Sequence, residues 1–373
     1  METPKGQVLA LILAGGAGGR LSPLTDERAK PSMPFGGVYR LIDFPLSNCM
    51  HSGIPDVWVL KQYAPHSLTD HLANGRPWDL DRSYGGLKVL FPQQGTDESG
   101  WYHGNADALY RNREQIAEFA PETLLVLSAD HLYKLDYGRV VQAHVERDAD
   151  VTVVTTQVPR EEAGRFGVVE VGGDGRLTSF EYKPEEPRSD LVTTEVFAYR
   201  TTRLLELLQE LADGEGEEDS GLDDFGDTLL PRLVEDGGAW DFRLESYWRD
   251  VGTIESYWKA HMELLEAEPG LRPDGDGWPI RSFAPQLAPA RVEAGAEIED
   301  SLLSPGCIVR GRVVRSVLGP GVVVQKGAEV VESVLLDGAC VADGATVERA
   351  IVAEDVEVEK HLRGTADEIA VQS

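Results

Sequence analysis

Cysteine is scarce in this chain: only Cys49, Cys307 and Cys340 occur among 373 residues, and no two of them form a CxxC pair. This scarcity excludes a disulfide scaffold and a cysteine-ligated zinc cluster. Long hydrophobic runs are also missing, because the apolar run that begins at Val8 spans only about seven residues, too few for a signal peptide or a membrane span. We therefore expect a cytoplasmic protein with no membrane partner.

Basic residues are few relative to acidic ones. The chain has 35 Lys and Arg against 64 Asp and Glu, a formal net charge of −29. Nucleic acids and anionic lipids are bound mainly through clustered Lys and Arg, so neither is an expected partner. A phosphorylated substrate would need a local positive site, which makes the few well-placed basic residues informative.

Short apolar runs alternate with amphipathic stretches in the first two thirds of the chain. The predicted strands are Val8–Leu13, Val57–Leu60, Thr123–Leu127 and Val151–Thr155, and the predicted helices include Asp107–Phe119 and Arg139–Arg147. This alternation predicts an α/β fold with a Rossmann-like, mostly parallel sheet covered by helices on both faces.

Composition divides the rest of the chain. The acidic, glycine-rich stretch Ala212–Asp224 is predicted to be an exposed loop, and Ile254–Leu265 a helix. Proline and glycine then accumulate, which is typical of a linker. We predict a domain over residues 1–267, a linker over 268–289, and a second domain with a polar tail over 290–373.

A repeat fills this second domain. The triplets Ser301-Leu302-Leu303, Ser316-Val317-Leu318, Ser333-Val334-Leu335 and Ala350-Ile351-Val352 begin 15, 17 and 17 residues apart. Such triplets with regular glycine turns predict a left-handed parallel β-helix of about 18 residues per coil. A β-sandwich of short strands is the alternative, but it does not explain the period.

A glycine-rich turn follows the first predicted strand, from Gly15 to Gly19, with Arg20 at its end. Backbone N–H groups in such a turn can approach a phosphate or a purine closely. The dinucleotide motif GxGxxG is not matched, because Leu21 stands at its third glycine, and no Gly-Lys-Ser/Thr of a Walker motif follows.

The segments that follow carry a resemblance to a known family. They are Leu24–Pro31 (LTDERAKP), Ile42–Asn48 (IDFPLSN), Asp130–Lys134 (DHLYK), Phe166–Val168 (FGV), Lys183-Pro184, Asp224–Gly226 (DFG) and Trp248–Thr253 (WRDVGT). In this order they resemble the bacterial ADP-glucose pyrophosphorylases. The resemblance implies transfer of a nucleotidyl group from ATP to glucose 1-phosphate, giving ADP-glucose and pyrophosphate for glycogen or α-glucan synthesis, by a homodimer or homotetramer that uses Mg²⁺.

The resemblance also implies the site residues. Asp130, Arg20 and Lys30 would be catalytic, and Asp130 and Asp250 would hold Mg²⁺. The implied nucleotide ligands are Leu13, Ala14, Gly15, Gly16, Gln62, Gly104 and Asn105, and the implied sugar-phosphate ligands are Lys183, Tyr182, Glu195 and Asp250. The chemistry needs such groups, because joining two polyanions requires a cation and basic side chains to offset their repulsion. The structural alternatives are a helix N-cap for Asp130 and an ion pair with Arg249 for Asp250.

Four positions depart from the family pattern: Ser22 stands where many relatives have an activator-contacting lysine, and the other three concern the substrate site. Ala17 replaces an arginine that contacts the triphosphate, and Tyr182 replaces a glutamate that binds sugar hydroxyls. Glu181 carries a carboxylate one position away, which in a strand faces the opposite side. Glu195 replaces a glycine at the sugar site, and we hypothesise that its carboxylate takes over the hydroxyl-binding role.

These departures keep two other functions open. One is a nucleotidyltransferase for a different sugar 1-phosphate or nucleotide, and the other is a weakly active or non-catalytic regulatory subunit of the same fold. An acyltransferase site in the β-helix is not expected, since no histidine lies between His261 and His361 to act as its base.

Overall fold

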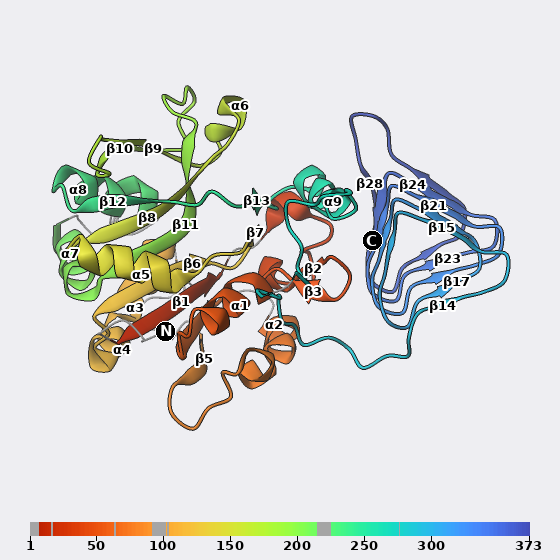
Figure 1. Ribbon diagram of the computed structural model, residues 1–373, viewed down its shortest axis with the longest axis horizontal. Coiled ribbons are helices and arrows are strands. Elements are labelled where there is room, and N and C mark those ends of the chain that lie inside the picture. The colour runs from red at the N-terminus through yellow and green to blue at the C-terminus, as the bar shows by residue number, and fades with distance from the viewer. Residues whose placement is uncertain are drawn as a thin grey trace.

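The protein consists of a helix-covered sheet and a three-sided β-helix at the opposite end of the molecule (Figure 1). The computed structural model describes residues 7–15, 18–62, 65–91, 102, 104–214, 225–275 and 277–373. Among these residues, no helix has the length and apolar character needed to cross a membrane.

Nine strands of the described chain form one mixed sheet in the order β10-β9-β11-β6-β1-β4-β5, with β8 between β11 and β12. They are β1 Val8–Ala14, β4 Asp56–Lys61, β5 Gly86–Leu90, β6 Thr123–Ser128, β8 Val151–Gln157, β9 Gly167–Val171, β10 Leu177–Tyr182, β11 Leu191–Arg200 and β12 Ala239–Arg243. All four predicted strands are confirmed, each one or two residues longer. The half from β6 to β5 is parallel, as expected, whereas β11 runs antiparallel to β6, β8 and β9.

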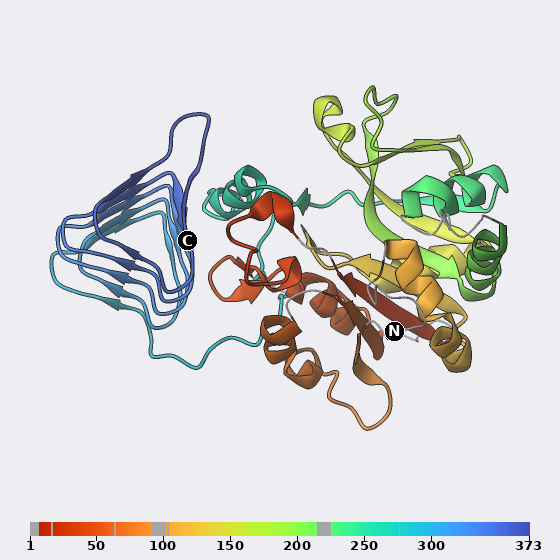
Figure 2. The same cartoon turned by 180° about the vertical axis from the view of Figure 1, so that it is seen from behind.

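Alternate residues of β1 pack against different helix layers. Leu9 and Leu11 belong to the core beneath α3, α4, α7 and α8, while Ala10 and Ile12 belong to the core beneath α1, α2 and α5. The helices are α1 Asp43–His51, α2 Pro65–Leu72, α3 Asn105–Arg111, α4 Arg113–Phe119, α5 Tyr137–Glu146, α6 Arg160–Ala163, α7 Thr201–Gly214, α8 Leu230–Glu235 and α9 Ile254–Glu263. The layer of α1, α2 and α5 faces the viewer in Figure 1, and the layer of α3, α4, α7 and α8 faces the viewer in Figure 2. A strand that is apolar on both sides thus accounts for the two layers.

Two predicted boundaries were wrong. The predicted helix Asp107–Phe119 is two helices that meet at Asn112, whose side-chain amide donates to the carbonyl oxygen of Ala108 at 2.8 Å and to the Tyr102 hydroxyl at 3.0 Å. Helix α7 continues through Ala212 to Gly214, the first part of the predicted loop, because its leucines keep helical spacing. The remainder of that loop lies outside the described residues.

Three parallel sheets of five strands each form the β-helix. The first is β14 Arg291–Val292, β17 Ile308–Val309, β20 Val323–Val324, β23 Cys340–Val341 and β26 Glu357–Val358. The second is β15 Glu297–Glu299, β18 Arg312–Val314, β21 Glu329–Val331, β24 Thr346–Glu348 and β27 His361–Arg363. The third is β16 Leu302–Leu303, β19 Val317–Leu318, β22 Val334–Leu335, β25 Ala350–Val352 and β28 Ala370–Gln372.

The repeated triplets stack in register in the third sheet, where Val317 pairs with Leu302 and Val334. A ladder of serine side chains runs beside them: the backbone N–H of Ser316 donates to the Ser301 hydroxyl oxygen, and that of Ser333 to the Ser316 hydroxyl oxygen, both at 3.1 Å. The sandwich alternative is therefore excluded. The strand pairs of this sheet give coils of 15, 17, 17 and 20 residues, close to the predicted length of about 18.

We expect Gly311→Ala to destabilise the β-helix, because a Cβ at Gly311 would lie 2.3 Å from the carbonyl oxygen of Ala328 and 2.8 Å from that of Gln325. Backbone atoms of neighbouring coils cannot move aside cheaply, so the expected cost is about 1–3 kcal/mol. Scanning calorimetry should show a lower Tm. Gly173→Ala is the control, since a Cβ there meets no atom within 4 Å. Equal Tm values for the two variants would contradict the prediction.

Helix α9 joins the two parts of the molecule. The indole N–H of Trp258 donates to the carbonyl oxygen of Glu332 at 2.7 Å, and Arg40 pairs with Asp337 at 2.8 Å. Tyr257 and Ile351 share a core cluster at this junction. Between α9 and β14 the described residues form no helix or strand. The domain boundaries at 267 and 289 stay a prediction.

Candidate active site

A cavity opens at the carboxyl ends of β1 and β6, the edge where parallel sheets commonly bind ligands. The volume of this cavity, including the open solvent at its mouth, is about 850 Å³. Eight of the predicted site residues line it: Leu13, Gly15, Lys30, Asn105, Asp130, Tyr182, Lys183 and Glu195. The groups predicted for nucleotide, sugar phosphate and metal therefore meet at one place.

Three other predicted nucleotide residues, Ala14, Gln62 and Gly104, are described but do not line the cavity. Gln62 follows β4 and approaches Gly15, where a Cβ would lie 3.6 Å from its side chain. Ala14 is buried, and Gly104 precedes α3 with an extended backbone. Gly16 and Ala17 lie outside the described residues.

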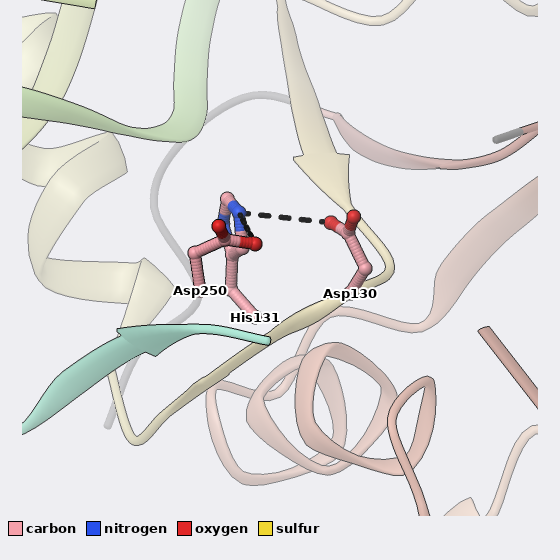
Figure 3. Close-up of side chains that lie close together, drawn as sticks. All are labelled: Asp130, His131 and Asp250. Atoms are coloured by element: carbon pink, nitrogen blue, oxygen red, sulfur yellow. Dashed lines mark ion pairs between the residues drawn. The ribbon is translucent and has the colours of Figure 1, made fainter. Parts of the chain in front are cut away.

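Asp130, His131 and Asp250 form a cluster beside the cavity (Figure 3). The short strands β7 His131–Tyr133 and β13 Trp248–Asp250 pair antiparallel, with Asp250 opposite His131. Nε2 of His131 lies 3.7 Å from Oδ1 of Asp130 and 3.8 Å from Oδ1 of Asp250. One potential ligand atom from each residue lies within 4.8 Å of the others. Two carboxylates so close together suit a hard divalent cation such as Mg²⁺.

Lys30 contacts both carboxylates of this cluster. It begins a short 3₁₀ turn, Lys30–Ser32, and its side chain is 8% exposed. Its Nζ donates to Oδ2 of Asp130 at 2.5 Å and lies 3.6 Å from Oδ1 of Asp250. A buried lysine is stable here because it is paired with two opposite charges.

The cluster shifts the protonation equilibria of its members. Burial raises the pKa of Asp130, but Lys30 and His131 outweigh this effect and hold the pKa well below its usual value. Burial lowers the pKa of His131 and of Lys30, but the surrounding carboxylates, including Glu195, raise both values overall. Nδ1 of His131 donates to the carbonyl oxygen of Thr194 at 3.0 Å, which fixes the ring. Asp130 is thus kept as a carboxylate, the form that binds cations.

Neither structural alternative for the two aspartates holds. Asp130 lies between β6 and β7 and caps no helix. Arg249 pairs with Glu263 rather than with Asp250. The partner that sequence reasoning missed is Arg165, whose Nη2 lies 3.2 Å from Oδ2 of Asp250. It stands just before the Phe166-Gly167 motif, and only that proximity could have indicated it.

Arg20 is exposed and reaches the same corner of the site. A Cβ at Gly252 would lie 2.9 Å from Oδ2 of Asp250 and 3.2 Å from Nη2 of Arg20. The absence of a side chain at Gly252 therefore keeps room for the guanidinium next to the carboxylate.

Lys183 and Tyr182 lie at the end of β10, which β9 and β11 separate from β6 in the sheet. Nζ of Lys183 donates to the Tyr182 hydroxyl at 2.6 Å. The Tyr182 ring packs against Gly226, where a Cβ would come within 2.3 Å of it. Glu181 faces the other side of the strand and pairs with Arg188 at 3.3 Å. The expected opposite orientation of Glu181 and Tyr182 is confirmed.

Glu195 enters the cavity from an irregular point of β11. The register with β8 shifts between Thr193 and Phe197, and Glu195 has φ of +55°. This left-handed backbone conformation favours glycine, which is the residue that the family pattern has at this position. The carboxylate of Glu195 is exposed at the cavity wall.

Aromatic side chains line much of the cavity and were not predicted as site residues. They are Phe166, Phe180, Phe197 and Phe225. Two of them precede glycines, Gly167 and Gly226, that belong to the recognised motifs. A Cβ at Gly167 would lie 2.8 Å from the Phe180 ring, so the glycine leaves the space that the ring occupies.

Comparison with known proteins agrees with this architecture. Residues 9–267 match the family model described as nucleotidyl transferase, and residues 286–368 match the model described as GlmU-like, C-terminal hexapeptide. The second match fits a left-handed parallel β-helix. A glucose-1-phosphate adenylyltransferase of Bacillus cereus is 41% identical over 356 residues, covering 95% of this chain and 94% of that protein. Proteins of the same name from Bacillus mycoides and Bacillus anthracis give the same values. The chain therefore belongs to the nucleotidyl transferase family, and these relatives are glucose-1-phosphate adenylyltransferases.

Proposed function

We propose that this protein transfers the adenylyl group of ATP to glucose 1-phosphate, giving ADP-glucose and pyrophosphate for glycogen or α-glucan synthesis. The observation that carries the proposal is the cluster of Asp130, Asp250 and Lys30 beside a cavity that Lys183 also lines. The names of the relatives agree with this reaction.

In the proposed reaction, a phosphate oxygen of the sugar phosphate attacks the α-phosphorus of ATP, and the bond to the pyrophosphate group breaks. The attacking oxygen is already anionic, so no side chain has to remove a proton. Lys183 holds the sugar phosphate, while Lys30 and Arg20 contact the triphosphate. Asp130 and Asp250 would hold Mg²⁺, which when bound offsets the charge of the phosphates. Catalysis then depends on positioning and electrostatics.

Pyrophosphate release from ATP, measured with and without Mg²⁺ across several sugar 1-phosphates, tests this function. We expect release that depends on both Mg²⁺ and glucose 1-phosphate. No release with any sugar 1-phosphate or nucleoside triphosphate would instead favour the non-catalytic subunit.

Glu195 favours a second candidate, a transferase with a different preference among sugar 1-phosphates. Its carboxylate lines the same cavity as Tyr182, whose phenol stands where the family pattern has a glutamate. We propose that Glu195 accepts hydrogen bonds from sugar hydroxyls. A carboxylate entering from β11 would contact different hydroxyls from one entering from β10.

Glu195→Gly is expected to change the order of kcat/KM values across a panel of hexose 1-phosphates. Losing a hydrogen bond to a charged group costs about 1.5–3 kcal/mol, or roughly 10- to 100-fold for the sugar that makes it. The backbone should tolerate glycine because φ is already positive. Glu181→Gln is the matched control, since that carboxylate faces Arg188. An unchanged order of preference in Glu195→Gly would reject the hypothesis.

The homo-oligomer, a dimer or tetramer, and the cytoplasmic location also remain proposals. Support for the oligomer comes from the first coil of the β-helix, where Val292, Ile298 and Leu302 are 51%, 37% and 40% exposed. Apolar side chains on an open sheet edge favour pairing with another subunit.

A further inference from the structure

Lys30 contacts one carboxylate oxygen of Asp130 and one of Asp250. Its Nζ lies 2.5 Å from Oδ2 of Asp130 and 3.6 Å from Oδ1 of Asp250. The remaining oxygens have other partners: the Ser128 hydroxyl donates to Oδ1 of Asp130, and Arg165 lies 3.2 Å from Oδ2 of Asp250. The ammonium of Lys30 is thus bound to both of the carboxylates that would hold a shared divalent ion.

We propose that Lys30 competes with the divalent cation for this carboxylate pair. The cation then binds both carboxylates only when the Lys30 ammonium moves to a phosphate of the nucleotide. The inference rests on the proposed function, because it takes Asp130 and Asp250 as the metal ligands. It assigns Lys30 a positioning role in addition to its contact with the triphosphate.

Charge and space both support this competition. An ammonium and a divalent ion at contact distance from the same oxygens would repel each other strongly in a site where Lys30 is 8% exposed. Lys30 also lines the cavity together with Gly15 and Asn105, on the side assigned to the nucleotide. Its flexible stem can therefore carry the ammonium from a carboxylate to a phosphate.

A coupling between metal and nucleotide follows from this arrangement. A nucleotide that attracts the ammonium releases the carboxylates for the cation, and a bound cation expels the ammonium toward the nucleotide. By linkage, each ligand must strengthen binding of the other by the same factor. The enzyme then binds the cation weakly by itself and tightly in the presence of the nucleotide.

Mn²⁺ titration of the full-length protein without nucleotide, followed by electron paramagnetic resonance of the free ion, tests the proposal. We expect Lys30→Met and Lys30→Gln to bind Mn²⁺ at least about tenfold more tightly than the parent, because the competing charge is gone. Lys30→Arg keeps the charge and should stay as weak as the parent. Thermal unfolding gives a second readout, since Mn²⁺ should raise the Tm of the two neutral variants more than that of the parent.

The outcomes separate this inference from the function on which it rests. Unchanged or weaker Mn²⁺ binding in both neutral variants would overturn the competition. Placing Asp130→Asn in the Lys30→Met background should abolish the gained affinity. If that double variant binds Mn²⁺ as tightly as Lys30→Met, the metal lies elsewhere, and the proposed metal site fails as well.

Discussion

Asp130→Asn is expected to lower kcat/KM for pyrophosphate release by at least about 10²-fold, the scale seen when one preorganised electrostatic group is removed from an active site. Asparagine keeps the shape of the side chain but removes the charge that faces Lys30 at 2.5 Å. The affinity for the cation should fall, and Lys30 should lose the carboxylate that holds it in position. Steady-state kinetics at saturating Mg²⁺ would measure the loss.

The control for this substitution is Asp190→Asn, because Asp190 is a carboxylate bonded to Gln157 away from the cavity. It should retain parental kinetics. If Asp130→Asn folds with a parental Tm and loses less than about tenfold in kcat/KM, the carboxylate pair does not carry the reaction.

The sheet and the β-helix could be predicted because their signals are local. Val8–Leu13 is apolar at every position, which indicates a strand covered on both faces, and β1 has this environment. The triplets predicted the third sheet because similar small and aliphatic side chains recur at each coil. The break at Asn112 could not be predicted in this way, because it depends on a side chain that bonds to Tyr102 from another segment.

The metal cluster could not be predicted from local sequence patterns alone. Asp130 and Asp250 are far apart in the chain, and the pairing of β7 with β13 brings them together. Motif resemblance could name both residues, but neither motif spacing nor composition indicates that Lys30 contacts both or that Arg165 joins them. Such contacts depend on where side chains from separate loops converge. The orientation of Glu181 away from the cavity was predictable, because alternation along a strand is a local rule.

Lys183→Met is expected to raise KM for the sugar 1-phosphate by about 10- to 100-fold, because a charge-assisted contact with phosphate contributes about 1.5–3 kcal/mol. Methionine retains the length of the side chain but loses the ammonium. KM for ATP should change far less, since Lys183 follows β10, which β9 and β11 separate from β6 and Asp130. Initial rates with each substrate varied in turn would separate the two effects.

Tyr182→Phe tests how Lys183 reaches the phosphate. The ring remains packed on Gly226, while the hydroxyl that accepts from Nζ of Lys183 at 2.6 Å is removed. A neutral partner of this kind orients the ammonium without neutralising it, so KM for the sugar 1-phosphate should rise by less than in Lys183→Met. Should Lys183→Met leave that KM unchanged while Tyr182→Phe raises it, the phosphate would be held by another group, and the assignment of Lys183 would be wrong. If Lys183→Met raised KM for ATP more than KM for the sugar 1-phosphate, Lys183 would contact ATP, and the assignment of the two substrate positions would have to be reversed.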